Sequence, residues 1–476
     1  MRALASVLLS SAVALSAGLS LSSTLGLAGT QETPSSQNTS PKNTSPLATL
    51  DQREVEALAI RLARSGPVVV QIQKSFDAFR ASPAARTTDG KATLDQAVRE
   101  LAFAASLAAA DSDPAQPKVV WIATAPREWL GHRVPGSRWG IDNPDNVYRN
   151  IPVDGGSKYE ITGKVEQPGP KQFSFLVYDS FFGEDGRRDH LDTPIAGLRD
   201  KDIKVNPDGT FKITLDSSPS AGRENHLQLN ADARVLLVRN TFDDWGHQTP
   251  LQVAVTRVDG PASSRPSQPA LEQRAAKFLK VGTESVLEWI NKGFGASAKA
   301  NEIAPPFLRG GGWGFAANGN YKLADDEGLV VTITPASAQY IGFDLTDPWL
   351  VSREHIKASG SLNNHQAVPN ADGSITYVIA ARDPGVPNWA DTGGLHDGHL
   401  LIRWQALTSP TPDTAGALRS VQLVKLSELR AALPAGTPSA TAAERARSLE
   451  AREAAYAHRY VGTGAGGPLQ AALTKP

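Results

Sequence analysis

Two blocks of the chain repeat the same order of short motifs at a nearly constant distance, and this repeat constrains the fold more than any other feature. The paired motifs, offset by 164, 163, 164 and 168 residues, are Asp208-Gly209 with Asp372-Gly373, Asn225 with Asn388, Leu236–Arg239 with Leu400–Arg403, and Phe175–Asp179 with Phe343–Asp347. Asp-Gly turns are common alone, but several shared motifs in one order indicate a duplicated domain.

Within each block, short apolar or alternating runs are bounded by turn residues, which is the pattern of strands in a sandwich. The runs are Tyr159–Val165, Phe173–Tyr178, Phe211–Leu215, Arg234–Arg239 and Leu251–Val258 in the first block, and Gly328–Thr334, Gln339–Leu345, Ser374–Ala380 and Gly398–Trp404 in the second. We therefore predict a mainly β protein with helical additions, built on two tandem β-sandwich (jelly-roll-like) domains.

Apolar residues three and four positions apart predict helices outside the two blocks. The predicted helices are Leu50–Ala63, Val68–Phe79, Leu94–Ala109 with Thr93 as its cap, Leu271–Ile290 between the blocks, and Ala442–Tyr460. The stretch after Asp111, which carries Trp121, Trp129 and Trp139, is expected to be irregular. The expected organisation is a signal peptide at 1–28, a disordered leader at 29–47, a helical segment at 48–115, a first sandwich at 116–260, a linker and helix at 261–300, a second sandwich at 301–410, and a C-terminal helix and tail at 411–476.

The first 28 residues have the layout of a secretory signal peptide. One charge at Arg2 precedes an apolar stretch without acidic residues, and small residues flank position 27 at Gly26 and Ala28. Ser and Gly interrupt the stretch, so it contains no apolar run long enough for a membrane-spanning helix. We expect cleavage near Ala28 and a mature bacterial protein that is periplasmic or extracellular, without membrane insertion.

The composition removes several chemistries. The chain has no Cys and one Met, which is the initiator. A disulfide framework, a thiolate nucleophile, a Cys-ligated metal and a lipid-anchored N-terminal Cys are therefore excluded. The 48 basic and 49 acidic residues give a net charge of -1, which argues against a nucleic-acid partner.

The second block resembles a known bacterial family. The residues that carry the resemblance are Tyr340–Leu345, Asp372-Gly373-Ser374, Pro387-Asn388-Trp389 and Gly398–Trp404. Residues 329–404 resemble the domain-of-unknown-function family twelve-fourteen. Residues 140–260, from Asp145–Tyr148 through Tyr178-Asp179, look more faintly like its partner, family twelve-fifty-four. The resemblance implies two β domains in an exported protein and implies no reaction.

The first candidate site lies in the polar run 138–149. Its ligand-binding candidates are Trp139, Asp142, Asn143, Tyr148 and Arg149. An aromatic face can stack on a sugar-like or carboxylated ligand while an arginine and amides orient it. The alternative is a connector whose Asp and Asn side chains satisfy their own turns.

The second candidate site lies between residues 363 and 399. His365, Asp383 and Arg382 are the catalytic candidates, as an acid–base pair with a neighbouring cation, and Asn388 and Trp389 are ligand-binding candidates. His396 and His399 are candidate ligands of a divalent metal with Asp383 or Asp391. The alternative is a set of ordinary loop histidines, since the segment lacks the helical HExxH pattern.

Three functions remain open at this stage. The chain binds a small or oligomeric ligand, carbohydrate-like or carboxylated, in a cleft that the two clusters share. Alternatively, it is a periplasmic hydrolase or lyase that uses a His/Asp pair, with or without a metal, or a structural protein of the cell envelope. No cofactor is predicted, and a divalent metal stays an open alternative.

Overall fold

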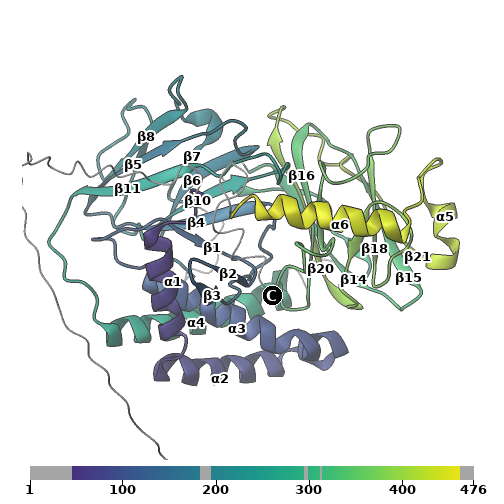
Figure 1. Ribbon diagram of the computed structural model, residues 1–476, viewed down its shortest axis with the longest axis horizontal. Coiled ribbons are helices and arrows are strands. Elements are labelled where there is room, and N and C mark those ends of the chain that lie inside the picture. Colours follow the sequence, from purple (N-terminus) through teal and green to yellow (C-terminus); the bar gives the residue numbers. More distant parts are fainter. Residues whose placement is uncertain (1–44, 183–193, 294–298, 311–312, 461–476) are drawn as a thin grey trace, which may run out of the picture. The chain divides into compact units, whose positions relative to one another are not determined.

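The computed structural model describes residues 45–182, 194–293, 299–310 and 313–460 (Figure 1). The predicted signal peptide and residues 29–44 of the predicted leader lie outside these ranges. Among the described residues, no helix combines the length and the apolar character needed to cross a membrane.

Five of the six α-helices in the described ranges are close to those predicted from periodicity, and the short α5 was not predicted. They are α1 Leu50–Leu62, α2 Gly66–Ala81, α3 Thr88–Ala110, α4 Gln268–Glu288, α5 Leu429–Ala432 and α6 Ala442–Ala457. The prediction was wrong for the start of α3, which is capped by Thr87 rather than Thr93. The Thr87 hydroxyl accepts a hydrogen bond from the Gly90 amide at 2.9 Å, and a polar first turn carries no apolar period that could reveal it.

The connector after α3 is more regular than expected. It forms β1 Val120–Ile122 and the hairpin of β2 Arg127–Trp129 and β3 His132–Val134. The Arg127 guanidinium lies 4.7 Å from the rings of both Trp121 and Trp129, and it pairs with the buried Glu56 of α1. Three-residue strands are too short to give a period, so the prediction of an irregular connector was wrong here.

The first sandwich consists of two facing sheets. One sheet has the order β1-β4-β10-β6-β7 and the other β11-β5-β8-β9. The strands are β4 Asn146–Pro152, β5 Lys158–Lys164, β6 Gln172–Tyr178, β7 Ala196–Arg199, β8 Thr210–Asp216, β9 His226–Gln228, β10 Val235–Thr241 and β11 Gln252–Asp259.

The second sandwich repeats this arrangement. Its sheets have the orders β12-β14-β20-β16-β17, with β13 also paired to β14, and β19-β18-β15-β21. The strands are β12 Glu302–Ile303, β13 Phe307–Leu308, β14 Phe315–Lys322, β15 Glu327–Ile333, β16 Ala338–Thr346, β17 Ser361–Asn363, β18 Ile375–Ala380, β19 Trp389–Asp391, β20 Asp397–Leu407 and β21 Leu418–Lys425.

The two sandwiches have the same topology. The order β4-β10-β6-β7 corresponds to β14-β20-β16-β17, and β11-β5-β8-β9 corresponds to β21-β15-β18-β19. Even the unusual parallel pair agrees, because β8 pairs with β9 and β18 with β19 in parallel. The predicted fold class, two tandem sandwiches with added helices, is confirmed.

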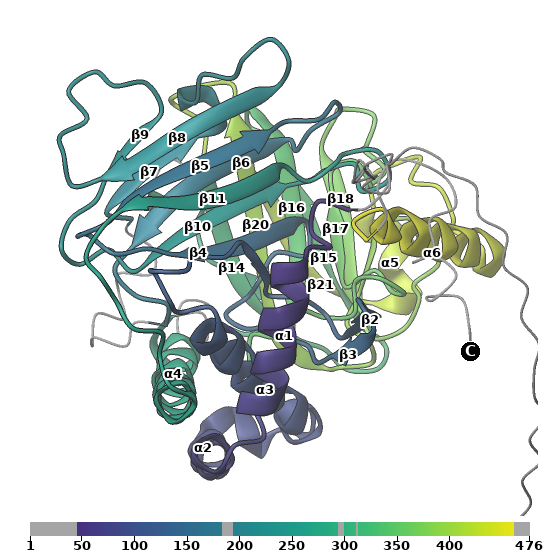
Figure 2. The ribbon, with the colours of Figure 1, turned by 60° about the vertical axis from the view of Figure 1, so that its left-hand side comes forward.

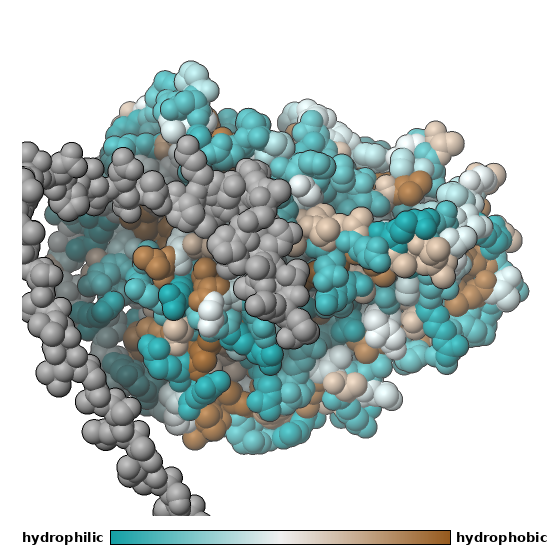
Figure 3. Space-filling view, viewed as in Figure 1, coloured by the Kyte–Doolittle hydropathy of each residue, from teal (hydrophilic) through white to brown (hydrophobic). Residues whose placement is uncertain are grey.

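Each sandwich has its own apolar core. Phe175 and Phe211 lie in the first core, and Phe343, Tyr377 and Trp404 lie in the second. Helices α1 to α4 are grouped on one side of the sandwiches (Figure 2). Teal atoms predominate on the face shown in Figure 3, and the brown atoms form small separate groups.

Helix α6 contacts both sandwiches through arginines seven residues apart. Arg445 lies 5.2 Å from the ring of Trp389 in the second sandwich. Arg452 donates to the Ser361 hydroxyl at 3.0 Å, and its guanidinium lies 4.4 Å from the ring of Trp245. The helix therefore helps to fix the two sandwiches relative to each other.

Candidate functional site

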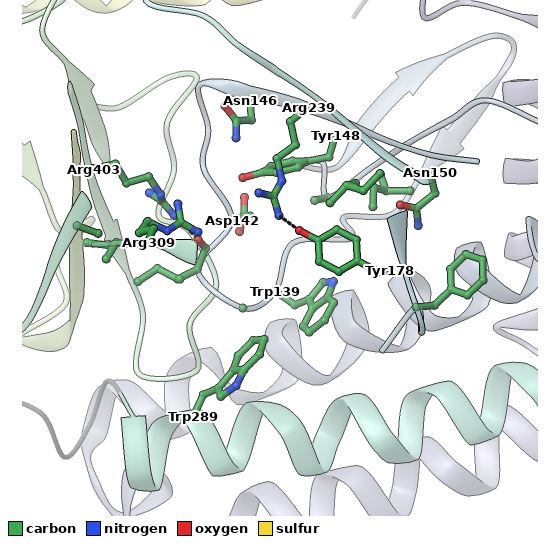
Figure 4. A pocket seen from close by; sticks show the side chains of 18 of the residues that line it. Trp139, Asp142, Asn146, Tyr148, Asn150, Tyr178, Arg239, Trp289, Arg309 and Arg403 are labelled. Atoms are coloured by element: carbon green, nitrogen blue, oxygen red, sulfur yellow. Dashed lines mark hydrogen bonds between the residues drawn. The ribbon is translucent and has the colours of Figure 1, made fainter. Parts of the chain in front are cut away.

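A cavity of about 430 Å³ lies between the two sandwiches (Figure 4). Strands β4 and β10 supply one wall, β14 and β20 the other, and residues 139–142 and the helical turn Trp289–Gly293 after α4 complete it. The polar and aromatic residues that line it include Trp139, Asp142, Asn146, Tyr148, Asn150, Tyr178, Arg239, Trp289, Arg309 and Arg403.

Strand alternation decides which side chains reach this cavity. In β10, Val235, Leu237 and Arg239 line the cavity, whereas Leu236 and Val238 belong to the core of the first sandwich. In β20, the residues that line it are Leu401, Arg403 and Gln405. The cavity is therefore bounded by the outer faces of two equivalent sheets.

Arg403, on the wall from the second sandwich, already has partners within the protein. It forms a buried ion pair with Asp344 of β16 and donates a hydrogen bond to the Ile141 carbonyl at 2.6 Å. Burial raises the pKa of the Asp344 carboxyl, and the positive charge of Arg403 opposes that rise. This guanidinium is committed to holding the connector against the second sandwich.

Arg239 occupies the equivalent position in the first sandwich but lacks this counterion. Asp344 lies opposite Leu401 in the sheet register, and the equivalent position opposite Leu237 is Leu176. Among the described residues, no acidic side chain lies within ion-pair distance of Arg239, and its buried Nε has no hydrogen-bond partner. Its remaining polar contact is with the Tyr178 hydroxyl, at 3.5 Å.

Aromatic rings surround this guanidinium and continue along the cavity. Arg239 lies 4.7 Å from the ring of Trp313 and 5.8 Å from that of Tyr148. Trp139 stacks on Trp289 of the turn after α4, with ring centroids 5.9 Å apart and planes within 2°. Gly140 permits this approach, because a Cβ there would lie 2.7 Å from the Trp289 ring.

Asp142 places a carboxyl group in the same cavity. Only 7% of the residue is exposed, and it accepts hydrogen bonds from the Ser352 hydroxyl at 3.0 Å and the Ser352 amide at 3.4 Å. Burial raises the pKa of this carboxyl to about 6, while the charge of Arg138 and the Ser352 hydrogen bonds oppose the rise.

The structure divides the first predicted cluster. Trp139, Asp142 and Tyr148 line the cavity. Asn143 instead donates from Nδ2 to the Tyr340 hydroxyl at 2.8 Å, which joins the two sandwiches. Arg149 points to the other face of β4, where it donates to Leu251 O and Asn240 Oδ1, because it is one residue out of phase with Tyr148.

The three predicted catalytic residues do not meet. Arg382 pairs with Asp325 at 2.8 Å, and Asp383 pairs with Arg445 at 3.1 Å. His365 lies 3.8 Å from Asp244 of the first sandwich, and its side chain is 55% exposed. In the described chain none of these residues lines the cavity, so the shared-cleft hypothesis was wrong. Arg382 and Asp383 lie on the loop between β18 and β19, His365 lies after β17, and each of the three side chains contacts a different partner.

Asn388 and Trp389 stabilise their own loop. Asn388 Nδ2 donates to the carbonyls of Val368 and Thr376 at 2.8 and 3.0 Å. Trp389 donates from Nε1 to the Ala380 carbonyl at 2.9 Å. Neither residue lines the cavity between the sandwiches, although Asn388 borders a smaller one of about 170 Å³.

The two predicted metal ligands serve separate neighbours. His396 Nε2 lies 2.8 Å from Asp325, whereas His399 Nδ1 lies 2.7 Å from the Asn320 side-chain oxygen. Burial lowers the pKa of His399 to about 4. Within the part of the chain that is described, no group of three or more His, Asp or Glu side chains is placed to hold a metal.

The sequence did contain a signal for the arginines that were missed. Arg239 and Arg403 are the last residues of the repeated tetrapeptide Leu-Leu-Val/Ile-Arg. In a strand, the second and fourth positions share one face, so each arginine shares its face with a leucine. What the repeat could not reveal is that the two faces lie across one cavity.

One family model matches the chain, over residues 148–242, and its description is "Protein of unknown function (DUF1214)". This is the family twelve-fourteen resemblance, but it falls on the first sandwich rather than on residues 329–404. The shared strand order explains why motifs of one copy resemble those of the other. The resemblance to the partner family stays a prediction.

Two solved structures are similar to this chain. An uncharacterized protein from Burkholderia cenocepacia is 26% identical, with a TM-score of 0.63, over 78% of this chain and 99% of that one. A protein from Vibrio parahaemolyticus is 12% identical, with a TM-score of 0.37, over 60% of this chain and 90% of that one. No curated protein matches the chain in sequence.

Proposed function

We propose that this protein binds a small organic carboxylate with a planar apolar body in the cavity between its two sandwiches. The observation that carries the proposal is the contrast between the equivalent arginines. Arg403 has Asp344 as its counterion, whereas Arg239 faces the cavity with Leu176 in that position.

A carboxylate suits the donors of Arg239. A guanidinium offers five N–H donors in a planar fork, which matches the two oxygens of a carboxylate. The Nη2 group of Arg239 already lies 3.5 Å from the Tyr178 hydroxyl, so a bound anion would lie within reach of both groups. In a partly buried site such charged hydrogen bonds are stronger than those between neutral groups.

The rest of the cavity suits an apolar, planar group. Trp139, Trp289 and Phe181 line it, and its volume of about 430 Å³ falls within the range of small-molecule sites. Aromatic rings gain most from contact with another flat apolar surface. This favours the carboxylated ligand over the carbohydrate-like one.

The proposal places this binding in the periplasm or outside the cell. Residues 1–28 support export, because their layout is that of a signal peptide. The proposed binding requires no cofactor, nucleic acid or membrane partner. Within the described ranges, His365 lies next to Asp244 and Asp383 pairs with Arg445, so these contacts do not favour an acid–base reaction by His365 and Asp383.

Calorimetric titration of the purified protein with benzoate tests the proposal, with benzyl alcohol as its uncharged analogue. We expect benzoate to bind at least about tenfold more tightly than the alcohol, because only the carboxylate forms charged hydrogen bonds. Arg239→Gln should abolish this preference. Arg234→Gln is the matched control, since Arg234 donates to Ala231 O and Ala233 O outside the cavity. Equal binding of both compounds, or unchanged benzoate binding by Arg239→Gln, would refute the proposal.

A further inference from the structure

Asp142 is a second charged group in the cavity that the proposed carboxylate would enter. It lines the same cavity as Arg239, and in Figure 4 its carboxyl group is drawn between Arg403 and Arg239. Its exposed fraction is only 7%, and Ser352 holds both of its oxygens by hydrogen bonds. The carboxyl is therefore fixed in place and poorly solvated.

The positive charges nearest to Asp142 already have carboxylate partners. Arg138 pairs with the buried Glu100 of α3, and Arg403 pairs with Asp344. Among the described residues, four charged groups interact electrostatically with Asp142: Arg138 of the connector, Glu100 of α3, and Asp344 and Arg403 of the second sandwich. Arg239 and Arg309 line the same cavity. Arg239 is the one of these that the proposed ligand would neutralise.

A bound carboxylate would place a second negative charge in this site. Two carboxylates that share a poorly solvated site do not both stay ionised, because each raises the pKa of the other. The Asp142 carboxyl already has a pKa of about 6 from burial, so it needs only a small further rise to be protonated near neutral pH.

We propose that Asp142 takes up one proton when the carboxylate binds, and that the protonated group donates a hydrogen bond to the ligand. This inference rests on the proposed function, since it concerns the same cavity and the same ligand class. Asp142 would then help to select the ligand. A carboxylate accepts a strong hydrogen bond from the protonated carboxyl, whereas an uncharged alcohol accepts a weaker one.

The proton uptake is directly measurable with benzoate as the probe. Calorimetry at about pH 7 in triethanolamine and in Tris buffer, which have different ionisation enthalpies and no anionic group that could compete for Arg239, should give different binding enthalpies. The difference should correspond to an uptake approaching one proton. The dissociation constant should fall by about tenfold to 50-fold between about pH 8 and about pH 6, because the protonated fraction of Asp142 in the free protein rises over that range. Benzoate itself stays ionised throughout.

Two substitutions test whether Asp142 is the group that takes up the proton. Asp142→Asn keeps the Ser352 contacts and a hydrogen-bond donor, so it should bind benzoate with an affinity that no longer depends on pH. Asp347→Asn is the matched control. Asp347 is likewise buried, with a pKa raised to about 6, but it does not line the cavity, so the pH dependence should persist.

The outcomes separate the two proposals. If the wild-type protein fails to bind benzoate at every pH, both proposals fail. If it binds with equal enthalpies in the two buffers and no pH dependence, the proposed function stands and the role of Asp142 is refuted. Proton uptake that survives Asp142→Asn would also overturn this role and assign the proton to another group.

Discussion

Replacing Leu176 by Asp should close the proposed binding site, because it would supply a counterion to Arg239. Asp344 lies opposite Leu401 in β20, and Leu176 lies opposite Leu237 in β10, at the equivalent place. A carboxylate at position 176 would therefore face Arg239 as Asp344 faces Arg403. It would compete with the ligand for the same donors.

The size of the effect follows from the bonds exchanged. A hydrogen bond to a charged group contributes about 1.5–3 kcal/mol, so losing the Arg239 contact should weaken benzoate binding by about 10-fold to 150-fold. The substitution also removes an apolar side chain that is 1% exposed and packs with Tyr178, Val235 and Trp313. That loss should cost about 2–5 kcal/mol of unfolding free energy, partly offset by the new ion pair.

Leu176→Asn separates charge from packing, because Asn has nearly the shape of Asp and loses the same apolar contacts. Calorimetric titration with benzoate should show the large loss for Leu176→Asp alone, after urea unfolding has verified that both variants are folded. If both variants lose affinity equally, the lost packing rather than the new charge explains the weaker binding. That result would contradict the prediction that a counterion at position 176 competes with the ligand. Wild-type affinity in Leu176→Asp would contradict the assignment of Arg239 as the anion-binding group.

Two further predictions concern stability. Asp344→Asn leaves Arg403 buried without its carboxylate and should lower the unfolding free energy by about 3–5 kcal/mol, whereas the double change to Leu at positions 344 and 403 should cost less; urea titration of both variants tests this. Asp142 has a folded-state pKa of about 6 against an ordinary 3.8, so its contribution to stability is complete below about pH 4 and declines as pH rises to about 6. Relative to the wild type, Asp142→Asn should therefore gain up to about 3 kcal/mol between about pH 4 and about pH 7 in urea titrations, and a constant difference would contradict the assigned shift.

The sequence predicted the fold where it carried a period or a repeat. The strand Phe173–Tyr178 was predicted within one residue of β6, because its apolar residues and flanking turns are local signals. Strand β4 was missed, since Asn146, Arg149 and Asn150 interrupt the apolar pattern. Asn146 and Asn150 line the cavity on one face of the strand. On the other face, Arg149 donates hydrogen bonds to Leu251 and Asn240, which are distant in the sequence.

The candidate site was predicted less well, for a related reason. Clustering in sequence identified Trp139, Asp142 and Tyr148, which share the cavity, and also Asn143 and Arg149, which do not line it. It then added residues 365–399, which are spread over several loops and strands and, among the described residues, do not line the cavity. Proximity along a loop says little about where side chains point, whereas the fourth position of a repeated strand motif, occupied by Arg239 and Arg403, carries a defined face.

Duplication explains how a binding site can arise between two domains rather than inside one. Two copies of the same sheet present the same outer face, so an arginine in the strand Leu-Leu-Val/Ile-Arg reaches the space between them twice. With an aspartate beside each arginine, both charges would be paired within the chain. A difference at one position, Leu176 in the first copy against Asp344 in the second, leaves Arg403 with a carboxylate partner and, among the described residues, Arg239 without one. The asymmetry between the copies is therefore the feature on which the proposed binding depends.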